Sequence, residues 1–239
     1  MTFSAGMPLA IELALFALAV VVLLIGIVGR GGGGPDPRAV ESSAESAGRV
    51  PRSGSRNGSA AGWVTLFGLL AIFGLTFTAA EGASILRGSF VQDALALFAK
   101  RLFLASAAIS VLGSLTLHQY AFTRRAAEYH FAIIVSVLGM SILASARELV
   151  LLFVAFELMS IPLFLMTGFL KRDPAAPEAA LKFFLVGTAS SAVIVYGMSF
   201  VYGATGSTAL EAIPAAMADG NRAANSETPR ALYAVAWSQ

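Results

Sequence analysis

The sequence contains no cysteine, and only 13% of its 239 residues are charged. Without cysteine the chain can form no disulfide, and it offers no thiolate ligand to an iron–sulfur cluster. Soluble domains carry about 25% charged residues. The shortage of charge, the 57% share of hydrophobic residues and the mean hydropathy of +0.77 therefore predict an integral membrane protein.

The sequence also lacks the residue patterns of several kinds of binding site. The two histidines, His118 and His130, have no zinc-ligand neighbours, so we interpret them as interfacial residues. The run GGGGP at 31–35 follows no predicted strand and precedes no GK[ST], which excludes a phosphate loop. No GxGxxG or haem-ligand pattern occurs, so we expect no cofactor and no metal in this chain. The basic residues lie between apolar runs and favour membrane topology over nucleic-acid binding.

Six apolar runs are long enough, or nearly so, to cross about 30 Å of hydrocarbon as helices. They occupy residues 8–29, 61–80, 102–122, 129–146, 149–170 and 179–203. The sequence thus predicts an all-α, polytopic transmembrane bundle of about six spanning helices. Before the third run, residues 91–101 are expected to form an amphipathic lead-in at the interface.

We divide the chain into five regions. These are a first transmembrane helix at 1–29, a flexible polar linker at 30–60, transmembrane helices two and three at 61–127, helices four to six at 128–206, and an external loop with the start of a seventh helix at 207–239. Within the last region, residues 218–230 are expected to form a loop. The positive-inside rule places the N-terminus outside the membrane.

The last two apolar runs each contain an ionisable residue, Glu157 and Lys182. A charge inside a membrane helix costs a few kcal/mol, so such residues usually face protein or a wet cavity. From the rise per residue, the two groups are offset by about 15 Å along the membrane normal, which predicts separate stations on a polar path. The alternative for Lys182 is a side chain that reaches to the interface. For Glu12, near the start of the first run, an interfacial carboxylate is the favoured interpretation.

Pro162 follows Glu157 and leaves the carbonyl of Leu158 without its helical partner. That carbonyl needs water, a hydroxyl or another helix, and Ser160 or Thr167 could supply the hydroxyl. Pro162 and Ser160 are therefore candidates for helix kinking and hydration near the acid. The alternative is that Pro162 kinks the helix only for packing.

Two stretches carry a family resemblance: ELVLLFVAFELMSIPLFLMTGFL, and EAALKFFLVGTASSAVIVYGMSFVYGATGS. They resemble the antiporter-like membrane subunits of respiratory complex I, in particular the subunit N family of NADH-quinone oxidoreductase. The resemblance assigns proton translocation to Glu157, in FELMSIP, and to Lys182, in EAALKFF. It covers only the N-terminal half of the family pattern, so the chain is expected to be truncated. The family's seventh-helix lysine, the cationic partner of Glu157, would fall at or beyond Gln239.

The resemblance also implies a setting. The chain would belong to a proton-translocating translocase complex in a bacterial inner membrane and hold no redox active site of its own. NADH, FMN, iron–sulfur clusters and quinone would bind to partner subunits elsewhere in the complex. Other membrane subunits and the lipid bilayer would be its partners, and nucleic acid would not. A multisubunit sodium/proton antiporter, a membrane-bound hydrogenase and a non-transporting scaffold or fragment remain alternatives.

Overall fold

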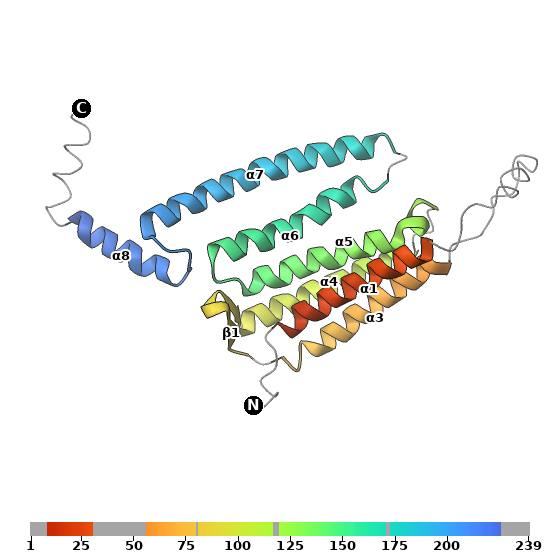
Figure 1. Ribbon diagram of the computed structural model, residues 1–239, viewed down its shortest axis with the longest axis horizontal. Helices are drawn as coiled ribbons and strands as arrows, with labels where there is room; N and C mark the ends of the chain where they lie inside the picture. The colour runs from red at the N-terminus through yellow and green to blue at the C-terminus, as the bar shows by residue number, and fades with distance from the viewer. Residues whose placement is uncertain (1–8, 31–55, 80, 117–119, 171–172, 226–239) are drawn as a thin grey trace, which may run out of the picture.

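The computed structural model of the protein describes residues 9–30, 56–79, 81–116, 120–170 and 173–225. These residues form seven helices and one short hairpin (Figure 1). The helices are α1 (Ala10–Arg30), α3 (Arg56–Leu75), α4 (Ala94–Thr116), α5 (Tyr120–Ser145), α6 (Leu149–Thr167), α7 (Ala175–Thr205) and α8 (Ala212–Asn225). The hairpin consists of strands β1 (Ala83–Ile85) and β2 (Phe90–Gln92), joined by the 3-10 helix η1 (Leu86–Gly88).

The predicted all-α membrane fold is confirmed. Five helices, α1, α4, α5, α6 and α7, are long and apolar enough to cross a membrane, and the apolar part of α3 is shorter, at Ala60–Leu75. Helices α1, α3, α4 and α5 pack into a four-helix bundle, α6 packs on α5, and α7 packs on α6. The last three therefore form a row that leads away from the bundle (Figure 1).

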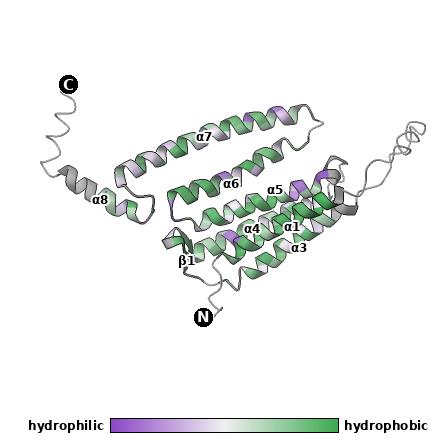
Figure 2. Cartoon of the chain, viewed as in Figure 1, coloured by the Kyte–Doolittle hydropathy of each residue, from purple (hydrophilic) through white to green (hydrophobic). Residues whose placement is uncertain are grey.

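The buried core lies inside the four-helix bundle. Most of its fully enclosed side chains are apolar, among them Ile11, Leu15, Val22, Leu69, Leu97, Leu104, Val111 and Ile134. In contrast, α7 has no buried residue at all, although hydrophobic residues recur along its length (Figure 2). A large exposed apolar surface marks contact with lipid or with another protein. The outer helices are thus built for an apolar environment.

The structure corrects the expected interfacial lead-in at 91–101. Residues 83–92 form the antiparallel hairpin, in which Leu86 and Gly88 of the turn have positive φ, as does Gly82 just before β1. Helix α4 then starts at Ala94, eight residues before the predicted third span. Asp93 accounts for this start because its Oδ1 accepts the backbone N–H of Ala96 at 2.7 Å, as an N-cap does. The segment is therefore the first part of a spanning helix, with Ala96 and Leu97 in the core and Leu95 and Phe98 exposed on its outer face.

The hairpin lies at the same end of the molecule as the α5–α6 and α7–α8 connections (Figure 1). Phe90 forms a β-bridge with Ala146, and the backbone N–H of Arg147 donates to the carbonyl of Ser89 at 2.8 Å. A second bridge joins Glu148 to Ala209. These bonds tie three connections into one polar end layer.

The expected loop at 218–230 is wrong over its first half. Residues 218–225 continue α8, an amphipathic helix that begins at Ala212. Its composition explains this, because alanine is the strongest helix former and Pro214 lies in the first turn, where proline is tolerated. Most of the predicted linker, residues 31–55, lies outside the described residues, and so do His118 and residues 226–239.

Candidate functional site

Glu157 lies in the middle of α6, eight residues after the helix begins at Leu149. At 1.5 Å per residue this is about 12 Å from the hairpin end of the helix. The side chain is half-buried, and its Oε1 accepts a hydrogen bond from the hydroxyl of Ser191 on α7 at 2.5 Å. The acid therefore faces the neighbouring helix and has a polar partner there.

Ser191 of α7 has two hydrogen-bond partners. Its hydroxyl lies 2.5 Å from Glu157 Oε1 and 3.1 Å from the carbonyl oxygen of Gly187 one turn earlier. A hydroxyl has one hydrogen to donate and lone pairs to accept with. It can donate to an ionised Glu157, or accept from a protonated Glu157 while it donates to Gly187. Either charge state of the acid finds a partner.

The hydroxyls around Pro162 have different partners from those we expected. Ser160 donates to the carbonyl of Phe156 at 2.8 Å, and Thr167 donates to that of Leu163 at 3.0 Å. Neither bonds the carbonyl of Leu158, which Pro162 frees. The sequence-based pairing is wrong because both hydroxyls bond the carbonyl four residues earlier on their own helix, as serine and threonine commonly do.

Close packing fixes the position of α6, and so of Glu157, along the axes of the neighbouring helices α5 and α7. A Cβ added at Gly139 of α5 would lie 2.8 Å from Met159 Cα and 2.9 Å from the carbonyl carbon of Leu158, so the two backbones nearly touch. Ser136, also on α5, donates to the carbonyl of Met159 at 3.0 Å. On the other side, a Cβ at Gly187 would meet the ring of Phe164. The small residues of α5 and α7 thus hold α6 in register.

Lys182 lies two turns into α7, at seven residues from Ala175. Its Nζ contacts Glu178 Oε1 at 2.5 Å, and both side chains are mostly exposed. Glu178 is one turn earlier on the same helix. Lys182 lies nine residues before Ser191, about 13 Å along the axis, so the structure does not bring Lys182 and Glu157 together. The two groups occupy separate levels.

The structure also shows an ion pair that we did not predict from the sequence. Glu12 of α1 and Lys100 of α4 form an ion pair of 2.7 Å, with side-chain exposures of 6% and 0%. We expected both residues to reach the interface. The spacing along the chain carries no sign of the pair, because 88 residues separate its members. The only sign of the pair in the sequence is that one apolar helix contains a single acid and another contains a single lysine.

His130 is buried inside the bundle and is not interfacial. Its Nδ1 lies 2.6 Å from the carbonyl of Ala126, and its Nε2 lies 3.0 Å from the hydroxyl of Ser114 on α4. Within the part of the chain that the structure describes, no three His, Asp or Glu residues gather as a metal site would require.

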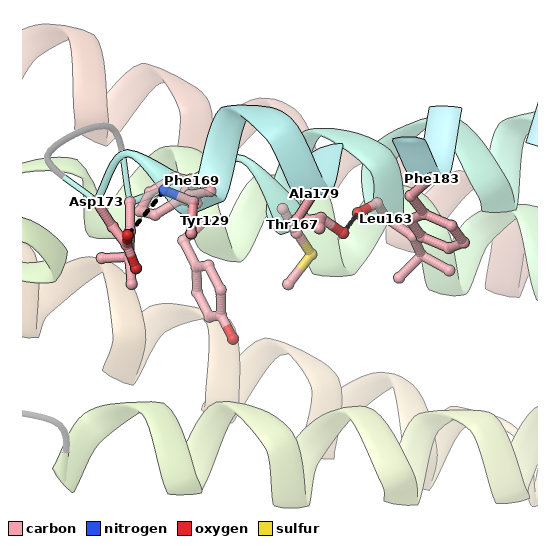
Figure 3. A pocket seen from close by; sticks show the side chains of 11 residues that line it. Tyr129, Leu163, Thr167, Phe169, Asp173, Ala179 and Phe183 are labelled. Carbon is pink, nitrogen blue, oxygen red and sulfur yellow. Dashed lines mark hydrogen bonds between the residues drawn. The ribbon is translucent and has the colours of Figure 1, made fainter. Parts of the chain in front are cut away.

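A cavity of about 680 Å³ opens between the ends of α6 and α7 that lie away from the hairpin. Leu163, Phe169 and Phe183 give it apolar walls, and Tyr129, Thr167 and Asp173 supply its polar groups (Figure 3). Glu157 lies six residues before Leu163 on α6 and does not line the cavity. A path from the cavity to the acid would run along α6 past Pro162.

Comparisons with known proteins find similar sequences for a large part of the chain. Residues 146–235 match the family described as "NADH:quinone oxidoreductase/Mrp antiporter, TM". NADH-quinone oxidoreductase subunit N 1 of Koribacter versatilis is 40% identical over 148 residues, which are 62% of this chain and 29% of the relative. F(420)H(2) dehydrogenase subunit N of Methanosarcina mazei is 37% identical over 161 residues, which are 64% of this chain and 32% of the relative.

A solved structure supports the fold. A chain of respiratory complex I from Thermus thermophilus with bound aureothin aligns with a TM-score of 0.59 and 28% identity, over 85% of this chain and 38% of that chain. The chain thus spans about a third of the length of the curated relatives it matches. The resemblance predicted from the sequence is confirmed: the chain is similar to curated N subunits of NADH-quinone oxidoreductases, and its residues 146–235 match the NADH:quinone oxidoreductase/Mrp antiporter membrane family.

Proposed function

We propose that the chain is a membrane subunit of an NADH-quinone oxidoreductase and that Glu157 carries protons within it. The observation that supports this most is the Glu157–Ser191 contact between α6 and α7. A group that loads and releases protons needs a partner in each charge state. Ser191, backed by the carbonyl of Gly187, can provide both.

The proton step is simple. With Glu157 ionised, the Ser191 O–H donates to Oε1. When a proton binds to the carboxylate, the new carboxyl O–H donates to Ser191 Oγ, and the Ser191 hydrogen rotates toward the carbonyl oxygen of Gly187. No side chain has to move far, because all three groups already lie within hydrogen-bond distance.

Lys182 and Glu178 form the second station in this proposal. The offset of about 13 Å along α7 is too long for a direct transfer, so water or groups of other subunits must connect the levels. The exposed position of the pair on α7 suits contact with such a subunit. NADH, FMN, iron–sulfur clusters and quinone are assigned to partner subunits. The F(420)H(2) dehydrogenase relative indicates that the electron donor differs among these complexes.

The membrane setting completes the proposal. We assign the chain to a bacterial inner membrane, with the hairpin end and the N-terminus outside. The basic residues support this orientation. Arg124 and Arg125 follow the third predicted span, Lys171 and Arg172 follow the fifth, and both pairs therefore fall on the side predicted to be inside.

A sodium/proton antiporter subunit is the second candidate, because the matching family includes Mrp antiporters by its description. Membranes that lack the chain, and the same membranes with the chain restored, separate the candidates. We expect the restored membranes to regain proton uptake driven by quinone reduction. Regain of uptake driven only by an imposed sodium gradient would instead favour the antiporter. If both activities persist without the chain, it is a scaffold and the proposal is wrong.

A further inference from the structure

A second acid, Glu12, is buried outside α6 and α7, in the four-helix bundle. Glu12 is in the first turn of α1, and Lys100 is two turns into α4, where their side chains pair at 2.7 Å. The family match at 146–235 includes neither residue. Ionised groups are costly to bury, and replacing such a pair by apolar residues is often neutral or stabilising. Stability alone is therefore a weak reason for this pair.

Lys100 is well supported as an ammonium group. Besides Glu12, its Nζ contacts Gln92 Oε1 on β2 at 3.3 Å and lies 5.0 Å from the centre of the Phe90 ring. An ammonium has three N–H donors, and an aromatic face attracts a cation. The contacts with Gln92 and Phe90 do not depend on the charge of Glu12.

The two oxygens of Glu12 differ in their surroundings. Oε1 accepts from Lys100 and from the hydroxyl of Ser141 at 3.2 Å. Oε2 is buried, and among the described residues it has no hydrogen-bond partner. The hydroxyl of Ser145, one turn beyond Ser141 on α5, is in the same condition. Buried polar atoms rarely remain unpaired, so two of them in one region call for a functional explanation.

We infer that Glu12 is a second proton-binding site, with Lys100 as its positioning residue. A proton adds to Oε2, the carboxylate becomes a carboxylic acid, and Oε1 keeps its contacts with Lys100 and Ser141. The net charge of the pair changes from zero to +1, and no other bond forms or breaks. The inference extends the proposed proton translocation to a site outside α6 and α7.

The proton reaches this site from the hairpin side. Toward the middle of the bundle, the walls are apolar: Leu15, Leu97 and Leu104 are almost fully buried. Toward the end, Gln92 is followed by Asp93, which pairs with the partly exposed Arg147.

The charged groups around the site are already engaged. Asp93 and Arg147 bind each other, and Arg101 donates to the carbonyl of Thr76 at 3.1 Å and lies over the Phe77 ring. Helix α3 contributes no charged group to this end of the core. Among the described residues, Glu12 is the buried carboxylate at this end, and its Oε2 has no hydrogen-bond partner.

Infrared titration of the full chain in lipid vesicles tests the inference. Since the chain has no cysteine, a Ser84→Cys variant treated with an impermeant thiol reagent reports how many hairpins face outward. We expect acidification on the hairpin side to produce a carboxylic-acid band that is lost in Glu12→Gln, a loss of one bound proton per chain. Glu157→Gln is the matched control, and it should retain this band.

The single variant Glu12→Gln leaves the buried Lys100 without its counter-ion and could therefore fold poorly. The double variant Glu12→Gln with Lys100→Gln removes both charges and so controls for such a folding defect. It should lose the same band. Identical titrations of the wild type and the double variant would overturn the proton site. A band that appears only when the side opposite the hairpin is acidified would overturn the access route. Neither result depends on pumping, so failure of this inference is distinguishable from failure of the function proposed for Glu157.

Discussion

Replacement of Lys100 by methionine should destabilise the protein by about 3–5 kcal/mol, the usual cost of removing one member of a buried ion pair. Methionine preserves much of the volume, so the loss is mainly electrostatic. The Glu12 carboxylate would keep only Ser141 as a partner on Oε1 and none on Oε2. It would then be a nearly unsupported charge in a core that, among the described residues, holds no other cationic partner for it.

A double-mutant cycle measures the interaction energy between Glu12 and Lys100. Adding Glu12→Gln to Lys100→Met removes the unpaired charge, and most of the lost stability should return. Unfolding in detergent, followed by circular dichroism against denaturant or temperature, measures all four proteins. Glu178→Gln is a control for an exposed pair and should change stability by about 1 kcal/mol or less. A Lys100→Met protein as stable as the wild type would refute the reasoning, and so would a double variant no more stable than the single one.

Other predictions follow from packing, hydrogen bonding and topology. Gly139→Ala should destabilise the protein by about 1–3 kcal/mol and more than Gly187→Ala, because the new methyl meets rigid backbone in the first case and a movable ring in the second; equal losses by thermal unfolding would contradict this. Ser191→Ala should slow proton uptake but leave assembly intact, since it removes the partner of the acid; an unchanged rate would rule out that role. Cysteines at Ser84 and Asp173 should react with impermeant reagents from opposite sides of the membrane, and labelling from one side would contradict the topology.

Hydrophobic length was enough to predict several of the spanning helices. The runs at 8–29, 149–170 and 179–203 correspond to α1, α6 and α7, because a spanning helix must satisfy its own backbone and so shows as one long apolar run. The start of α4 at Ala94 was missed because its polar residues, Asp93 and Lys100, resemble an interfacial pattern until their partners are known. Those partners are Arg147 and Glu12.

The residues of the candidate site could also be predicted only in part from the sequence. Glu157 and Pro162 stand out in the sequence because a charge and a proline are unusual within an apolar helix. Ser191 does not stand out, since a serine beside alanines and glycines also suits close packing. Only the register of α6 against α7, set by Gly139 and Gly187, brings its hydroxyl to the acid. Pairings between distant segments depend on such register, and a single sequence does not contain it.

The most direct test of the account is proton uptake by vesicles that contain the assembled complex with Glu157→Gln. We expect assembly at wild-type levels and a loss of most quinone-driven proton uptake, because glutamine keeps the shape and the contact with Ser191 but cannot carry the proton. Glu157→Asp should retain part of the uptake, and Glu178→Gln, which removes an exposed carboxylate, should affect it less. Wild-type uptake by the Glu157→Gln complex would contradict the central claim that this carboxylate carries protons.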